Sequence, residues 1–215
     1  MDRLAQLARH AQSSPRDAVR LVTLISADAA HPGAGACYID GAVPDVMLET
    51  LQALFQALPL AARVRESQGR NERAYYCDVD GSIGTVLQAA VHAAALDASR
   101  RAGDGQLLPC AGESLPQMRF LCYAEAGGGL APHTDLSRTR RADNRTSRCT
   151  FILYLTDCAS GGRTVLLERL LGGRAIAEVE PRRGRLLLFP HLCPHRADEV
   201  VAEGLPKLLL RGEMI

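Results

Sequence analysis

The chain from about residue 105 onward is a series of short apolar segments separated by glycine-containing turns, and this pattern constrains the fold most strongly. Leucine, valine and aromatic residues fill the segments, and such residues favour extended strands. Short strands at regular spacing indicate an antiparallel sandwich or barrel. The predicted strands are QMRFLCYAE (117–125), RCTFILYLTD (148–157), RTVLLERL (163–170), RAIAEVEP (174–181), RLLLFPH (185–191) and PKLLLRGEM (206–214).

The first 105 residues have a different pattern. Apolar residues recur there at helical spacing, and a short strand is expected at ACYIDGAV (36–43). We therefore predict a mainly β fold with a helical flank (α+β). Residues 1–105 would form a helical region packed on a barrel of residues 106–215, within one structural domain overall. The predicted helices cover 2–11, 14–30, 44–59 and 82–102.

Composition limits the kinds of partner that can be expected. A chain of 215 residues with a net charge of +1 has no global basic field, so we expect no nucleic acid partner. It has no run of apolar residues long enough for a membrane span, and its seven cysteines form no CxxC pair. An odd, scattered set of cysteines favours a reducing compartment. We therefore expect a cytoplasmic protein that does not bind membranes.

One short stretch, LAPHTDLSRT (130–139), contains two potential metal ligands one residue apart. In an extended chain His133 and Asp135 point to the same side, so both can approach one ion. A third ligand can come from FPHLCPHRADEV, which contains His191 and His195. Two histidines with one carboxylate form the facial triad of non-haem Fe(II) oxygenases. The residues alone leave open which of the two later histidines completes such a site.

The order of several motifs resembles that of a known family. RFLCYAEAGGGLAPHTD is followed by FILYLTD with its SGG turn, then by RRGRLLLFPH, and finally by HRADEVVAEGLPKLLLRGEM. This order, from about Arg119 to Met214, resembles the 2-oxoglutarate- and Fe(II)-dependent oxygenases, specifically the prolyl 4-hydroxylase-like branch. The resemblance implies a double-stranded β-helix, a jelly-roll or cupin-like barrel. It also implies a dioxygenase that couples decarboxylation of 2-oxoglutarate to succinate with hydroxylation of a substrate.

The resemblance also implies roles for the metal-binding residues. His133, Asp135 and His195 would be the ligands of Fe(II) and the catalytic residues. His191 matches a histidine often found four positions before the third ligand, so it is the second choice and is expected to be a neighbour of the site. The implied cofactors are Fe(II), the cosubstrate 2-oxoglutarate and O2, with ascorbate as a candidate supporting reductant.

Similar enzymes hold the distal carboxylate of 2-oxoglutarate with a basic residue on the last strand and with a tyrosine. Lys207, the single lysine of the chain, lies twelve residues after His195 and fits the basic role. Arg211 would lie on the same strand face and is the alternative. Tyr123 and Tyr154 resemble the cosubstrate-pocket tyrosines, although each could equally be a core residue with a satisfied hydroxyl.

An arginine-rich segment, LSRTRRADNRTSRC, follows Asp135. The equivalent loop of similar enzymes often closes over the substrate, so residues 136–147 are a candidate lid and Arg138, Arg140 and Arg141 are candidate substrate contacts. Such a lid would suit an acidic substrate, either a peptide or protein residue or a small molecule. The alternative is a solvated arginine-rich loop.

Two related groups lack support in this sequence. The nucleic-acid demethylases of the AlkB type carry R-x5-R, which Arg211 cannot complete before the chain ends at Ile215, and the R-x-S of the isopenicillin-synthase-like group is replaced by Arg211-Gly212-Glu213. An alternative function of another class is a non-catalytic module that binds or senses a metal or 2-oxoglutarate on the same barrel.

Overall fold

The computed structural model describes residues 19–41, 43–61, 71–102, 108–109 and 112–215. The helix predicted at 2–11 lies outside these residues. Within these described residues two α-helices, α2 (Asp45–Ala57) and α3 (Ser82–Ala102), accompany eleven strands. The strands are β1 (Arg20–Thr23), β2 (Cys37–Asp40), β3 (Glu72–Cys77), β4 (Gln117–Tyr123), β5 (Leu130–His133), β6 (Cys149–Tyr154), β7 (Thr164–Leu167), β8 (Ala175–Val179), β9 (Leu186–Pro190), β10 (His195–Ala197) and β11 (Lys207–Met214).

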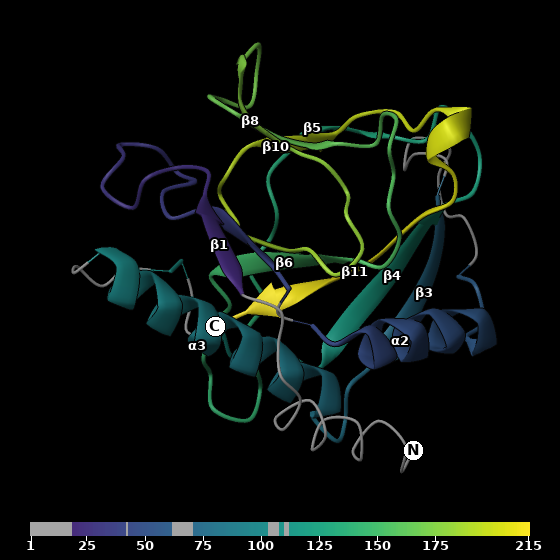
Figure 1. Cartoon of the computed structure of the whole chain (residues 1–215), viewed down its shortest axis with the longest axis horizontal. Coiled ribbons are helices and arrows are strands. Elements are labelled where there is room, and N and C mark those ends of the chain that lie inside the picture. The colour runs from purple at the N-terminus through teal and green to yellow at the C-terminus, as the bar shows by residue number, and fades with distance from the viewer. Residues whose placement is uncertain (1–18, 42, 62–70, 103–107, 110–111) are drawn as a thin grey trace.

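The strands form two sheets that face each other (Figure 1). The larger sheet has seven strands in the order β1-β2-β9-β6-β11-β4-β3, and the smaller has four in the order β5-β10-β7-β8. All strand pairs within the two sheets are antiparallel. This arrangement is the predicted double-stranded β-helix, and it places the middle of β11 opposite the β5–β10 pair.

Both helices lie against the outer face of the larger sheet, on the side away from the smaller sheet (Figure 1). Helix α2 buries Met47, Leu48 and Leu51, which recur at helical spacing and face the sheet. The carboxylate of Asp78 accepts hydrogen bonds from the backbone N–H groups at the start of α3 and so caps that helix. None of the helices in the described part of the chain is long and apolar enough to cross a membrane.

Alternation along the strands divides the core into two layers. Leu208 and Leu210 of β11 pack with the helices, whereas Leu209 points between the two sheets. The same face as Leu209 therefore carries Lys207 and Arg211 toward the barrel interior. This alternation explains why charged residues flank the three leucines of this strand.

The structure confirms the predicted helices at 44–59 and 82–102 and all six predicted strands after residue 105. The helix predicted at 14–30 lies outside the described residues over 14–18 and is wrong over 19–30, where no residue is helical and Arg20–Thr23 forms β1 and pairs with β2. Here the β-branched residues and the hydrogen bonds offered by β2 outweigh the helical spacing of the apolar positions. The proposed boundary at residue 105 stays a prediction, and the larger sheet contains strands from both sides of it.

Candidate metal centre

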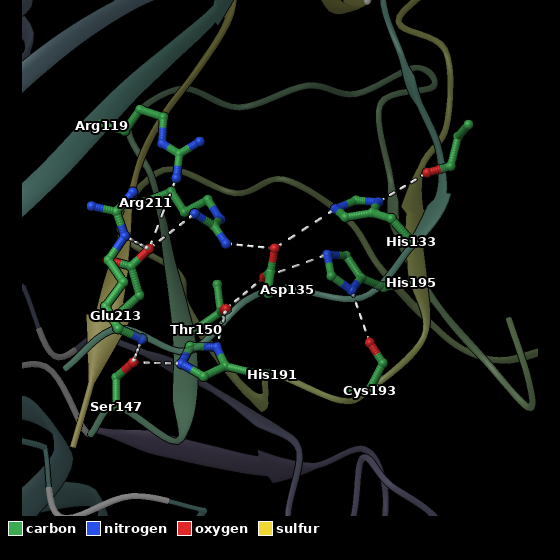
Figure 2. Close-up of polar contacts among 12 residues, drawn as sticks. Arg119, His133, Asp135, Ser147, Thr150, His191, Cys193, His195, Arg211 and Glu213 are labelled. Atoms are coloured by element: carbon green, nitrogen blue, oxygen red, sulfur yellow. Dashed lines mark hydrogen bonds and ion pairs between the residues drawn. The ribbon is translucent and has the colours of Figure 1, made fainter. Parts of the chain in front are cut away.

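Three side chains that can ligate a metal converge at the smaller sheet. His133 ends β5, Asp135 follows two residues later, and His195 begins β10 directly opposite His133 in the strand register. One potential ligand atom of each residue lies within 4.8 Å of the others. Figure 2 shows both imidazoles on one side of the Asp135 carboxylate. The structure thus brings together the three residues that the sequence pattern selected.

The hydrogen bonds of the two histidines leave the same ring nitrogen facing Asp135. Nδ1 of His133 donates to the carbonyl of Ala131 and Nδ1 of His195 donates to the carbonyl of Cys193, both at 2.9 Å. A carbonyl only accepts, so each Nδ1 carries the hydrogen and each Nε2 keeps its lone pair. Both Nε2 atoms lie 3.8 Å from an oxygen of Asp135. Metal-binding histidines are oriented by contacts of this kind.

Burial lowers the pKa of the His195 imidazole to about 4, even though the charge of Asp135 opposes this effect. His195 is therefore neutral around neutral pH, and the neutral ring is the form that binds metal ions. His133 is more accessible, with 31% of its side chain exposed. The chemistry and orientation of the two histidines and the carboxylate fit a divalent metal such as Fe(II), with room left for ligands from outside the protein.

Both oxygens of Asp135 are held in place. Oδ1 accepts a hydrogen bond from the Arg211 guanidinium at 2.5 Å, and Oδ2 accepts one from the Thr150 hydroxyl at 2.5 Å. Burial would raise the pKa of the Asp135 carboxyl, but the charge and hydrogen bond of Arg211 outweigh it and lower the pKa to about 2. Asp135 is thus a fixed carboxylate at neutral pH.

His191 lies beside the three converging residues and makes different contacts. Its Nδ1 lies 3.0 Å from the Thr150 hydroxyl, and its Nε2 lies 2.9 Å from the Ser147 hydroxyl. The Thr150 hydroxyl donates in turn to Asp135, and the Ser147 hydroxyl accepts from the backbone N–H of Arg138. His191 therefore links the arginine-rich loop to the carboxylate, as Figure 2 shows for its side-chain contacts.

Lys207 lies fully buried in the barrel interior, with 0% of its surface exposed. Its ammonium donates to the carbonyl of Gly162 at 2.5 Å and lies 4.9 Å from the centre of the Tyr123 ring. Burial lowers the pKa of the Lys207 ammonium to about 8. Tyr154 is also fully buried, and its hydroxyl lies 2.7 Å from the Thr164 hydroxyl.

The two basic residues considered for 2-oxoglutarate therefore occupy different surroundings. Arg211 already pairs with Asp135 and lies 3.3 Å from Glu213, whereas Lys207 has a neutral carbonyl as its hydrogen-bond partner. A buried ammonium without an adjacent carboxylate is costly unless an anion binds beside it.

The arginine-rich loop is an ordered hairpin in which the three predicted contact residues separate. Arg140 is bound by the carboxylates of Asp143 and Glu113, and Arg141 is exposed. Arg138 lines a pocket of about 430 Å³ that also contains His133 and Asp135. The structure therefore places one of the three candidate substrate arginines beside the metal centre.

Sequence reasoning missed four residues that surround the site. Thr150 and Glu213 are polar positions in buried strands, and Arg119 and Arg73 lie on strands at one edge of the larger sheet. Arg119 could have been found, because it lies four residues before Tyr123 and therefore shares its strand face. The position of β3, which carries Arg73, was not predicted.

Comparison with known proteins adds evidence on the family to which the site belongs. Residues 118–212 match the family model of the 2OG-Fe(II) oxygenase superfamily. This segment belongs to that superfamily. The match agrees with the family predicted from the motifs, a family that uses Fe(II) and 2-oxoglutarate. No curated protein matches the chain in sequence.

Several solved structures share the fold of this chain. A prolyl-4-hydroxylase from Pseudomonas putida is 22% identical, with a TM-score of 0.55, and the match covers 84% of this chain and 91% of that one. A Trichoplax adhaerens prolyl hydroxylase, solved with a hypoxia inducible factor peptide, is 16% identical with a TM-score of 0.52 over 84% and 83% of the two chains. HygX from Streptomyces hygroscopicus, solved with nickel, 2-oxoglutarate and hygromycin B, is 17% identical with a TM-score of 0.51 over 82% and 81%.

Proposed function

We propose that the chain is a hydroxylase of the prolyl 4-hydroxylase-like branch, in which His133, Asp135 and His195 hold Fe(II). The observation that supports this most strongly is the orientation of the two histidines: each Nδ1 is tied to a carbonyl, and each Nε2 faces the carboxylate. Bound Fe(II) would supply O2 activation, which couples 2-oxoglutarate decarboxylation to substrate oxidation. The protein side chains fix the geometry in which these reactants meet.

We propose that Lys207 binds the distal carboxylate of 2-oxoglutarate and that Tyr123 and Tyr154 line the same pocket. Lys207 is buried next to the Tyr123 ring and has no carboxylate among its hydrogen-bond partners in the described residues. An incoming carboxylate would offset the cost of the buried charge. Arg211 instead positions Asp135 by holding one of its oxygens, which leaves it less suited to the cosubstrate.

We further propose that the substrate is a peptide or protein residue or a small molecule, and that the chain works in the cytoplasm. The structural neighbours with a peptide and with hygromycin B show that this fold accepts both classes of ligand. A cytoplasmic location agrees with the odd, scattered set of seven cysteines in the sequence, which contains no CxxC pair.

A turnover screen tests the proposed function. Purified chain with Fe(II), 2-oxoglutarate and O2 is offered proline-containing peptides and small metabolites, and mass spectrometry detects the gain of one oxygen atom. The proposal expects at least one compound to gain oxygen together with formation of an equal amount of succinate. Tight binding of Fe(II) and 2-oxoglutarate with no succinate from any compound would instead favour the non-catalytic binding module.

A further inference from the structure

The metal centre opens onto a pocket with an unusual number of arginines. Arg73, Arg119, Arg138 and Arg211 all line the pocket of about 430 Å³ that contains His133 and Asp135. A second pocket, of about 300 Å³, shares Arg119, Arg138, Arg211 and Glu213 with the first, so the two adjoin. The arginines come from three strands and the arginine-rich loop, which the fold brings to one place.

Strand register explains why these positive charges lie together. Arg119 of β4 is directly opposite Arg211 of β11 on one side and opposite Tyr75 of β3 on the other. Arg73 is two residues from Tyr75 and therefore shares its strand face. Arg138 reaches the same place from the loop, since its Nε lies 3.7 Å from Glu213. Like charges opposite each other in a sheet are unfavourable unless an anion separates them.

The pocket lining contains fewer carboxylates than guanidinium groups. Asp135 pairs with Arg211, which also contacts Glu213, so Arg119 and Arg138 share the Glu213 carboxylate with Arg211, whereas Arg73 donates to the side chain of Asn71. Glu213 lies 3.8 Å from Arg119 and 3.7 Å from Arg138, and among the described residues neither guanidinium donates a hydrogen bond to an acceptor. Burial and the charge of Arg211 both lower the pKa of Arg119, as expected for a cation with too little counter-charge.

We propose that Arg119 and Arg138, together with Arg73, bind a carboxylate of the substrate and thereby select an acidic substrate for the metal centre. This inference rests on the proposed function and names the substrate class for the same site. A guanidinium matches a carboxylate with two parallel hydrogen bonds, and two guanidinium groups with open donors suit a single carboxylate. The pocket volume suits a small molecule or one side chain of a peptide.

The cosubstrate is not expected to occupy this pocket. Lys207, the proposed partner of 2-oxoglutarate, is completely buried between the sheets and does not line the pocket. Arg119 is more accessible, with 26% of its side chain exposed. A ligand that arrives from solvent can therefore meet Arg119 and Arg138 while 2-oxoglutarate lies at Lys207.

A binding experiment with matched acids and amides tests the proposal. The chain is saturated with Fe(II) and 2-oxoglutarate without oxygen, and calorimetry measures binding of aspartate against asparagine and of glutamate against glutamine. A second arm uses blocked tetrapeptides, Gly-Pro-Asp-Gly and Gly-Pro-Asn-Gly, to distinguish a free acid from an acidic side chain. In at least one arm the acid should bind about tenfold more tightly than its amide, and added salt should reduce this preference.

The substitutions Arg119→Gln and Arg138→Gln should each reduce the acid preference to about threefold or less. The control Arg174→Gln removes the same charge from a side chain that is 80% exposed and does not line the pocket, so it should keep the preference. Phosphate-like anions are tested in parallel with aspartyl phosphate analogues of the same peptides, and tighter binding of these than of the acid would contradict the choice of a carboxylate.

Equal binding of acid and amide in every arm, including binding of neither, would overturn the proposal. A loss of 2-oxoglutarate affinity in the two variants would also overturn it, because the pocket would then belong to the cosubstrate. Failure of the proposed function looks different: Fe(II)-dependent binding of 2-oxoglutarate would itself be absent from the wild-type chain.

Discussion

Replacement of Lys207 by methionine should stabilise the protein when 2-oxoglutarate is absent. The pKa of Lys207 lies near 8 in the folded chain, against an ordinary value of 10.5. Each pKa unit corresponds to about 1.4 kcal/mol, so the buried charge costs the fold about 3 kcal/mol near pH 7. Methionine keeps a similar unbranched shape but loses the hydrogen bond to Gly162, worth about 1 kcal/mol. We therefore expect a net gain of about 2 kcal/mol in the free energy of unfolding.

The pH dependence gives a second measure of the same effect. Between roughly pH 8 and 10.5 the unfolded chain binds a proton at Lys207 that the folded chain has released, so the free energy of unfolding rises with pH across this window. The advantage of Lys207→Met over wild type should therefore be largest below about pH 8 and decline by about 3 kcal/mol as the pH approaches 10.5.

Urea denaturation with a metal chelator present measures these free energies. Leu209→Met, at the next inward-facing position of the same strand, is the control and should cost less than about 1.5 kcal/mol with no added pH dependence between pH 8 and 10.5. Saturating 2-oxoglutarate, added to the Fe(II)-loaded proteins, should further raise the melting temperature of wild type and of the control but not that of Lys207→Met. A Lys207→Met protein that is less stable than wild type by more than about 2 kcal/mol near pH 7 would refute the reasoning.

Further predictions concern the metal site and its surroundings. His195→Ala should lose bound iron while His191→Ala keeps it, as measured by metal analysis of the purified variants; the reverse result would exchange the two roles. Lys207→Ala should weaken 2-oxoglutarate binding by about 2–5 kcal/mol and Arg211→Ala by less, and a titration that ranks them the other way would move the carboxylate contact to Arg211. Glu113→Gln should speed proteolysis of the arginine-rich loop and cost at most about 1 kcal/mol in stability, because its two ion pairs are partly exposed; unchanged cleavage would show that other contacts hold the loop.

The barrel and the convergence of His133, Asp135 and His195 were predictable because their signals are local. Glycine turns and short apolar segments mark most of the strands, and His133 and Asp135 lie two residues apart in one extended stretch. Strand β1 was not predictable, since Arg20–Thr23 shows helical spacing and becomes a strand through its partner β2. A local sequence pattern carries no information about which distant strand offers unpaired backbone N–H and C=O groups.

The surroundings of the metal site depend on register, which the sequence does not display. The pairing of Arg119 with Arg211 and the contact of Arg211 with Asp135 follow from how β4, β11 and the β5 end align in space. The sequence therefore makes Arg211 a second candidate for the cosubstrate but does not reveal that its guanidinium pairs with the Asp135 carboxylate. For the same reason the arginines of the loop looked equivalent until the hairpin separated Arg138 from Arg140.

Formation of succinate from 2-oxoglutarate tests the central claim most directly. The wild-type chain and Asp135→Ala are incubated with Fe(II), 2-oxoglutarate and O2, and succinate is measured over time, including the slow turnover that needs no substrate. The account predicts succinate from wild type only when Fe(II) is present, and a loss of about a hundredfold or more in Asp135→Ala, because removal of one metal ligand disables the site. Succinate formation that is equal in the two proteins, or absent from wild type with Fe(II) and the full set of candidate substrates, would contradict the account.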